Sequence, residues 1–256
     1  MARTIIAGNW KMNHGPRETR EFVAGMKEKY QTPPAVETVI CPPFVSISDL
    51  VNESPEWLKT GAQNVYFEES GAFTGEVSPK MLAELGVEYV IIGHSERRNI
   101  FAESDEEVNK KVRIALKYGI KPIICVGESD AQRNEGKTLE VVENQVKSAL
   151  SEVVSDTLQN VVFAYEPVWA IGSGKAATGE DAEQVCKHIR SVISELNSSV
   201  ADDIPVLYGG SVKPENLEEF MDQDNINGAL VGGKSLVAET YCQLLEVARR
   251  FPGDEG

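Results

Sequence analysis

The sequence predicts an α/β protein, a closed (β/α)8 barrel formed by one domain over residues 1–256. Short apolar runs rich in Val and Ile recur along the chain, and amphipathic stretches separate them. Eight such runs divide the 256 residues into units of 32, about the size of one strand–helix repeat. A doubly wound open sheet usually has fewer strands, so closure into a barrel is favoured.

The predicted strands are hydrophobic without alternation, which is typical of parallel strands covered on both faces. In chain order they comprise residues 4–7, 39–41, 60–63, 89–92, 123–126, 161–165, 206–208 and 229–231. Three segments between them have the clearest helical pattern. Residues 104–118 open with Ser104 and Glu107 at capping-box spacing and stop at Gly119. Residues 139–153 and 180–196 place apolar side chains along one helical face.

In barrels of this kind the chemistry lies at the carboxyl ends of the strands, so the residues after each run are the candidates. Asn9 and Lys11 follow the first strand, His94 the fourth and Glu166 the sixth. Glu166 can act as a general base, and His94 can donate a hydrogen bond to a carbonyl oxygen. Lys11 can offset developing negative charge. Together they fit proton abstraction next to a carbonyl group.

Glycine-rich turns follow the seventh and eighth strands, in YGGS and VGGKS. Such turns bring backbone N–H groups close to an anion, and barrel enzymes commonly bind phosphate there. We expect a phosphorylated substrate bound without a metal, since the histidines are scattered and no cluster has metal-ligand spacing. The apolar segment directly after Glu166 predicts a loop that closes over the base and excludes water.

The charge balance and the cysteines exclude several classes of protein. A net charge of −15 disfavours binding to nucleic acid or to anionic membranes. No run approaches the roughly 18 apolar residues that span a bilayer, and the first residues lack the pattern of a signal peptide. The four cysteines are far apart, which predicts buried, unpaired thiols and a reducing cytoplasm.

Several motifs together resemble the triosephosphate isomerase family over essentially the whole chain. They are AGNWKMN, GAFTGE, GHSERR, CVGE, AYEPVWAIGSGKAATGE, YGGSV and GALVGGKSL, in the family's order and spacing. The resemblance implies a TIM barrel that interconverts dihydroxyacetone phosphate and glyceraldehyde 3-phosphate without a cofactor, in glycolysis and gluconeogenesis.

The resemblance also implies roles for individual residues. Lys11, His94 and Glu166 would be catalytic, with His94 acting as a neutral electrophile. The substrate would be bound by Asn9, Lys11, Gly172, Ser173, Ser211, Gly232 and Gly233, most of them at its phosphate. Residues 167–176 would form the lid. The family is usually a homodimer, so the loop from Gly71 to Glu76 would insert into a partner subunit, with Thr74 near the partner's site.

Four positions depart from the family's commonest pattern. Ser173 and Ala176 stand where threonine is usual, and Gly179 replaces a proline and could loosen the start of the next helix. Lys234 replaces a small residue beside the phosphate loop. It either adds attraction for the anion or points to solvent, and the sequence leaves both open.

Two of the glycine-rich motifs also match nucleotide-binding patterns. GALVGGKS at residues 228–235 fits the pattern of a phosphate-binding NTPase, but the predicted strand lies inside the motif and only 21 residues follow it. GSGKAA at 172–177 matches a relaxed dinucleotide fingerprint, but an apolar segment separates it from its strand. A phosphate-binding barrel without catalysis is a third possibility, and the intact set of Lys11, His94 and Glu166 argues against it.

Some polar residues have a simpler interpretation. His188 lies mid-helix among apolar residues, which predicts a structural histidine, and His14 is expected in a solvated loop. Arg97 and Arg98 could bind phosphate, but ion pairs with neighbouring acids are favoured.

Overall fold

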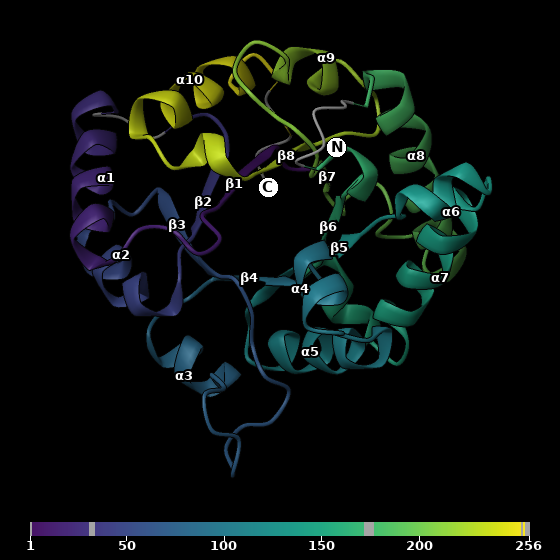
Figure 1. Ribbon diagram of the computed structural model, residues 1–256, viewed down its shortest axis with the longest axis horizontal. Helices are drawn as coiled ribbons and strands as arrows, with labels where there is room; N and C mark the ends of the chain where they lie inside the picture. The colour runs from purple at the N-terminus through teal and green to yellow at the C-terminus, as the bar shows by residue number, and fades with distance from the viewer. Residues whose placement is uncertain (1, 31–33, 172–176, 252, 254–256) are drawn as a thin grey trace.

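The structure is a computed structural model that describes residues 2–30, 34–171, 177–251 and 253. Its parallel strands follow one another in chain order around a closed barrel, and β1 pairs with β8 to complete the circle. Figure 1 shows the helices as a ring around these strands. The predicted (β/α)8 barrel is therefore confirmed.

All the predicted strands are present. They are β1 (Ile5–Asn9), β2 (Glu37–Cys41), β3 (Leu58–Ala62), β4 (Tyr89–Ile92), β5 (Lys121–Val126), β6 (Val162–Tyr165), β7 (Val206–Tyr208) and β8 (Gly228–Val231). One difference concerns β3, which begins at Leu58 instead of residue 60 and ends before Gln63. Gln63 consequently lies at the carboxyl end of β3 rather than within it, a place where barrels put functional side chains.

The α-helices of the described chain lie outside the barrel. They are α1 (Pro16–Lys29), α2 (Ile47–Glu53), α3 (Pro79–Glu84), α4 (Ser95–Ile100), α5 (Asp105–Lys117), α6 (Asp130–Asn134), α7 (Thr138–Leu150), α8 (Gly179–Leu196), α9 (Leu217–Met221) and α10 (Ala238–Ala248). Short 3-10 helices are η1 (Phe44–Ser46), η2 (Ser155–Asn160), η3 (Val168–Ala170) and η4 (Gly233–Ser235). None of the helices described is both long and apolar enough to cross a membrane.

Capping explains where two of the predicted helices start. The Ser104 hydroxyl accepts the Glu107 N–H at 3.2 Å, and the Glu107 carboxylate accepts the Ser104 N–H at 2.9 Å, as the capping-box spacing predicts. At the start of α8, Thr178 and Asp181 form a second capping box. The Gly179 N–H donates to Glu219 at 2.7 Å, a bond that a proline could not make, so this end of α8 is held and not loosened.

Successive side chains along each strand point alternately into the barrel and outward toward the helices, so the protein has two hydrophobic cores. The one inside the barrel contains Ile5, Ala7, Val39, Cys41, Tyr89, Ile91, Ile123, Cys125, Val162, Ala164, Leu207 and Leu230. The residues between these point outward and pack with the helices in a second, larger core. Both faces of each strand are therefore buried, which is why the strand sequences show no polar alternation. All four cysteines are free and buried, as predicted.

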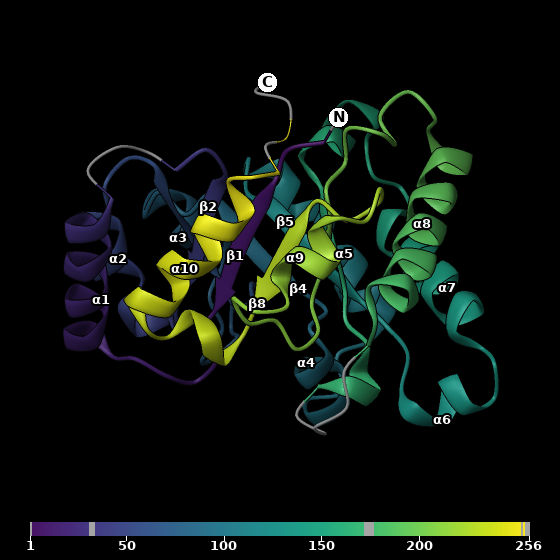
Figure 2. The same ribbon diagram turned by 90° about the horizontal axis from the view of Figure 1, so that it is seen from above.

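The inward-facing residues of each strand, taken at every second position, also determine which groups lie at the carboxyl end of the barrel. On β1 the series Ile5, Ala7 continues to Asn9, and on β6 the series Val162, Ala164 continues to Glu166. On β7 and β8 the next position in the series is a glycine, Gly209 and Gly232. Since glycine adds no side chain, this end of the barrel stays hollow. Figure 2 shows β1 running toward this end, where α4 also lies.

Candidate active site

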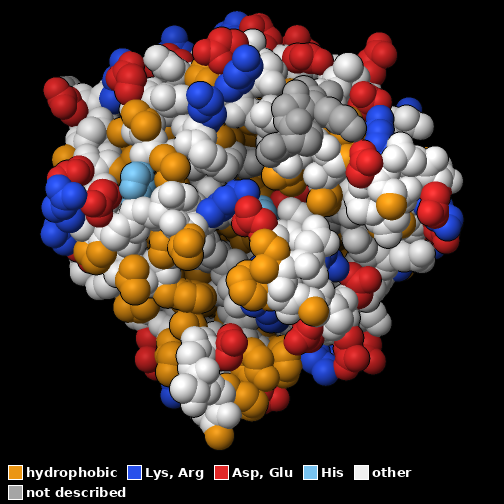
Figure 3. Space-filling model, in the orientation of Figure 1, with side chains coloured by type: hydrophobic (Ala, Val, Ile, Leu, Met, Phe, Trp, Pro, Cys, Tyr) orange, Lys and Arg blue, Asp and Glu red, His pale blue; other side chains and the backbone are white. Residues whose placement is uncertain are grey.

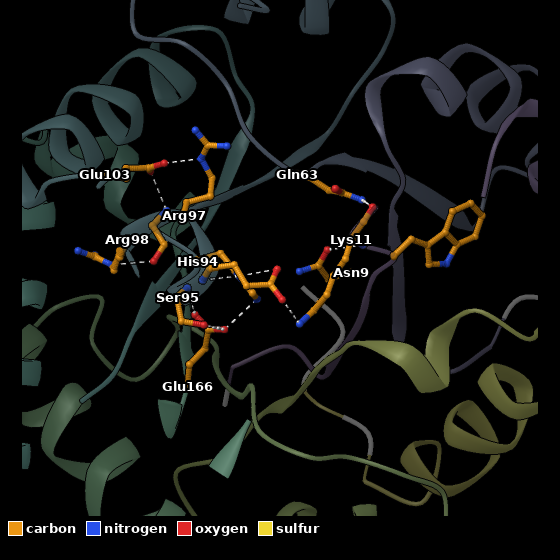
Figure 4. Close-up of polar contacts among 12 residues, drawn as sticks. Asn9, Lys11, Gln63, His94, Ser95, Arg97, Arg98, Glu103 and Glu166 are labelled. Atoms are coloured by element: carbon orange, nitrogen blue, oxygen red, sulfur yellow. Dashed lines mark hydrogen bonds and ion pairs between the residues drawn. The ribbon is translucent and has the colours of Figure 1, made fainter. Parts of the chain in front are cut away.

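A cavity of about 490 Å³ opens at the carboxyl end of the barrel. It is lined by Asn9, Lys11, His94, Glu166, Ile171, Gly209, Gly210, Ser211, Val212, Leu230, Gly232, Gly233 and Lys234. These include all the site residues predicted from the sequence except Gly172 and Ser173, which lie outside the described residues. Figure 4 shows the side chains of Lys11, His94 and Glu166 converging from separate elements.

Glu166 is the most buried charged group of the cavity, at 2% exposure. Its carboxylate accepts the Ser95 N–H at 2.9 Å and the Ser95 hydroxyl at 3.1 Å, and it lies 2.9 Å from His94 Nε2. Burial disfavours its charge, but the attraction of His94 and these hydrogen bonds outweigh burial and lower the pKa of Glu166. The structure therefore holds an ionised carboxylate with little contact with water.

Close backbone packing holds Glu166 in place. Its N–H donates to the Val126 carbonyl at 2.8 Å, which joins the ends of β5 and β6. The next residue after β5 is Gly127, where a Cβ would lie only 1.8 Å from the Glu166 carbonyl oxygen. Only glycine allows the two strand ends to approach this closely.

His94 caps the N-terminus of α4. Its Nδ1 accepts the Glu96 N–H at 3.2 Å, so the ring proton is assigned to Nε2, which faces Glu166. Burial disfavours the imidazolium, but the charge and hydrogen bond of Glu166 outweigh it and raise the pKa of His94. Lys11 acts in the opposite direction, to lower that pKa.

Lys11 stands in a left-handed backbone conformation, φ 53°, which is uncommon for a residue with a side chain. The Asn9 side chain accepts its N–H at 3.0 Å, and Gln63 donates to its carbonyl at 2.8 Å. Its ammonium group pairs with Glu96 at 2.7 Å. The sequence prediction missed Gln63. The period of two along β3 would have found it, because Gln63 continues the inward-facing series.

A second buried acid, Glu128, anchors the segment after Glu166. It is fully buried and accepts the Trp169 indole N–H at 2.9 Å and the Tyr165 hydroxyl at 3.2 Å. The Arg133 guanidinium lies 4.1 Å from the Trp169 ring centroid. Glu128 follows β5 as Glu166 follows β6, a signal that was available in the sequence. Of the predicted lid, residues 167–171 are described, and residues 172–176 lie outside the described residues.

The structure settles the simpler readings of the other polar residues. Arg97 pairs with Glu103, and Arg98 pairs with Asp105 at 2.6 Å, as predicted. The expectation of a solvated His14 was wrong. Its Nε2 lies 2.8 Å from the Leu236 carbonyl, and its ring packs edge-on against Trp10, because the loop after β1 is folded against η4.

The nucleotide motif at residues 228–235 takes a different form from that of an NTPase. Its first glycine starts β8 (Gly228–Val231), so the strand lies inside the motif. Gly232 and Gly233 form the turn that lines the cavity. Lys234 lies in η4, at the edge of the cavity. In the part of the chain that the structure describes, no three His, Cys, Asp or Glu side chains are arranged to hold a metal ion.

The sequence model of the triosephosphate isomerase family matches residues 4–248 of the chain. The match therefore runs from the residue before β1 to the end of α10 and includes every described residue of the cavity.

Proposed function

The chain belongs to the triosephosphate isomerase family of glycolytic isomerases, and from this premise we propose that it interconverts dihydroxyacetone phosphate and glyceraldehyde 3-phosphate through an enediolate, without a cofactor. The observation that carries the proposal is the convergence of Glu166, His94 and Lys11 on one cavity that the glycine-rich turns after β7 and β8 also line. A carboxylate, an imidazole and an ammonium group suit proton transfer beside a carbonyl, and the glycine-rich turns suit a phosphate.

Glu166 is the proposed base. It would take a proton from one substrate carbon and return it to the neighbouring carbon. To do so it must leave Ser95 and His94, the donors that lower its pKa. Once those bonds are broken, burial remains and raises the pKa of the carboxyl group, so the base becomes stronger where it meets the substrate.

His94 is the proposed electrophile. The Glu166 carboxylate is the main group that raises the pKa of His94. When Glu166 turns toward the substrate, burial and Lys11 remain and lower the pKa of His94, and the Glu96 N–H at Nδ1 also favours the neutral ring. The Glu96 carboxylate opposes them, but its effect on this pKa is smaller than that of burial or Lys11. A neutral imidazole would donate its Nε2 proton to the carbonyl oxygen that becomes negative. Lys11 would stabilise the same charge, which forms in a cavity with little water.

Phosphate binding is assigned to the side of the cavity formed by the turns after β7 and β8. Ser211, Gly232 and Gly233 line the cavity there and would offer backbone N–H groups to the phosphate. Gly172 and Ser173 complete the proposed set, together with Asn9 at the side of Lys11. The segment after Glu166 is proposed to close over the bound substrate, with Glu128 and Trp169 holding its first turn.

A homodimer is part of the proposal. The loop from Gly71 to Glu76 is exposed along its whole length and projects from the barrel at the bottom of Figure 1. Next to the catalytic cavity lies a second cavity of about 260 Å³, lined in part by Lys11, Phe44 and Phe101. Figure 3 shows hydrophobic side chains gathered between this region and the projecting loop.

The occupant of the second cavity would be the same loop of another copy. Phe73 in the loop is 40% exposed, and Met12, Val45 and Phe101 beside the cavity are 95%, 72% and 65% exposed. An apolar loop and an apolar receptor on one chain are self-complementary, as a twofold dimer requires. The buried, unpaired cysteines support the proposed cytoplasmic location, where thiols stay reduced.

An isomerase assay in heavy water tests the proposal. Purified protein with glyceraldehyde 3-phosphate and no added metal should give dihydroxyacetone phosphate that carries solvent deuterium at carbon 1, detected by NMR. Deuterium enters because the proton on Glu166 exchanges with solvent while the enediolate is present. Turnover without any deuterium in the product would show that the transferred hydrogen does not exchange with solvent, as a direct hydride shift between the carbons requires. Absence of turnover would contradict the isomerase activity.

A further inference from the structure

The sequence leaves two alternatives open for Lys234 of the nucleotide-like motif, attraction for the anion or a position in solvent, and the proposed mechanism does not use this residue. We propose that Lys234 is a capture residue, which draws the phosphate dianion of the substrate into the cavity by its charge and takes no part in proton transfer. This inference rests on the proposed function, because it assumes a phosphorylated substrate.

The position of Lys234 is the first observation. It lines the catalytic cavity directly after Gly232 and Gly233, and Ser211 also lines this cavity. The residue is exposed, so its ammonium group stays in contact with water at the edge of the cavity. A lysine carries a compact charge on a flexible stem, which suits attraction of an anion over a distance better than a rigid hydrogen-bonding geometry does.

The charge balance of the cavity is the second observation. Among the described lining residues the cations are Lys11 and Lys234. Lys11 forms an ion pair with Glu96 at 2.7 Å, which cancels much of its field at a distance. Within the ranges that the structure describes, no ion pair involves Lys234. Of the two lysines that line the cavity, Lys234 is therefore the one whose charge no described ion pair neutralises.

The charge of the whole molecule makes this cation important. The protein carries a net charge of −15, and the cavity holds the ionised Glu166, so an anionic substrate is repelled on its approach. Figure 3 shows acidic side chains mainly around the edge of this face, and at its centre a basic side chain next to an acidic one. Since charges are screened beyond about 8 Å at physiological ionic strength, a cation at the entrance governs the last part of the approach.

The test compares Lys234→Ala with Lys187→Ala. Lys187 is an exposed lysine on α8, outside the cavity, so both variants change the net charge equally. At an ionic strength of about 0.01 M, Lys234→Ala should lower kcat/KM about threefold to tenfold, and kcat should stay unchanged. Lys234→Glu should lower kcat/KM further, Lys234→Arg should preserve it, and Lys187→Ala should match the wild type.

Salt distinguishes long-range attraction from a fixed hydrogen bond. Near 1 M salt the Debye length is about 3 Å, so the difference between wild type and Lys234→Ala should disappear. Three results would overturn the proposal: equal kcat/KM at low salt, a loss that persists undiminished at high salt, or a fall in kcat.

Inorganic phosphate provides a readout that needs no turnover. Calorimetric titration at low salt should show weaker phosphate binding to Lys234→Ala than to the wild type or to Lys187→Ala. If the chain proved inactive on triose phosphates, the proposed function would fail, and this titration would still decide whether Lys234 attracts a phosphate dianion. Equal affinity in all three proteins would refute the role of Lys234.

Discussion

Both ends of the barrel carry charged residues, but the two ends use them differently. At the amino end, Glu37 at the start of β2 accepts the hydroxyl of Tyr89 and lies 3.4 Å from Arg3 and 3.7 Å from Lys121. These groups come from elements that meet only at this end. They neutralise one another and, with the Tyr89 ring inside the barrel, close it.

At the carboxyl end the charges surround a space. Glu166, His94 and Lys11 also have partners, but they face a cavity of about 490 Å³. β8 shows the contrast within a single strand. At its start a Cβ on Gly228 would lie 1.9 Å from the Ile5 carbonyl, whereas beyond its end the nearest atom to a Cβ on Gly232 would be Lys11 Cε at 3.5 Å. One glycine permits close packing and the other leaves room for a ligand.

This contrast predicts that changes at the carboxyl end affect activity and that changes at the amino end affect stability. The largest effect is expected for Glu166→Gln. It removes the proposed base but retains the shape of the side chain, so kcat should fall about 10²–10⁴-fold. The melting temperature and phosphate binding should change little. Steady-state kinetics and calorimetry measure these quantities, with the exposed Glu140→Gln as the control.

Glu166→Gln also tests which group raises the pKa of His94. With the carboxylate gone, burial and Lys11 should lower the pKa of His94 relative to the wild type. An NMR titration of the imidazole in both proteins measures the change. An unchanged or higher pKa of His94 in Glu166→Gln would show that Glu166 is not the group that raises it.

A smaller but still large loss is expected for Gly127→Ala. The new Cβ would meet the Glu166 carbonyl at 1.8 Å, so the end of β6 must shift and carry the base with it. A displacement of about 1 Å can cost about 10²-fold in kcat. Kinetics measure the loss, and a crystal structure of the variant locates Glu166. Full activity with an undisplaced Glu166 would contradict the close-packing argument.

The proposed dimer also concerns the carboxyl end of the barrel, because the loop from Gly71 to Glu76 of one copy would fill the second cavity of the other. Thr74→Arg places a charge in the expected interface and should raise the dimer dissociation constant about a hundredfold or more. Activity should fall with the fraction of dimer. Sedimentation velocity and kinetics measure both, with the exposed Ser198→Arg as the control. An unchanged dimer would rule out this loop as the contact.

The smallest effect on activity is expected at the amino end. Tyr89→Phe removes the hydroxyl that donates to Glu37, so the free energy of unfolding should fall about 1–3 kcal/mol. For a chain of this size that corresponds to a melting temperature about 2–10 °C lower. kcat should remain that of the wild type. A large fall in kcat without loss of stability would contradict the prediction that changes at the amino end affect stability and not activity.

Most of the fold was predictable because the signals that define it are local. The apolar runs mark the strands, and the Ser104–Glu107 box marks the start of α5, since both depend on residues a few positions apart. The barrel rule then placed Asn9, His94 and Glu166 at one end, because each lies at the carboxyl end of a strand or within two residues of it. Those positions all line the cavity that the structure contains.

The partners of those residues were not predictable in the same way. Gln63 reaches the Lys11 carbonyl, Glu128 anchors Trp169, and His14 contacts Leu236, although 222 positions separate the last two. The positions of Gln63 and Glu128 near strand ends mark them as candidates, but their contacts arise from how the barrel closes and how its loops pack, and the sequence does not specify these contacts. The order of strands, helices and polar strand ends thus follows from the amino-acid sequence, because neighbouring residues specify each of them. The open space, the pairing of charges around it and the resulting pKa shifts follow from closure, which brings distant residues into contact and removes water from them.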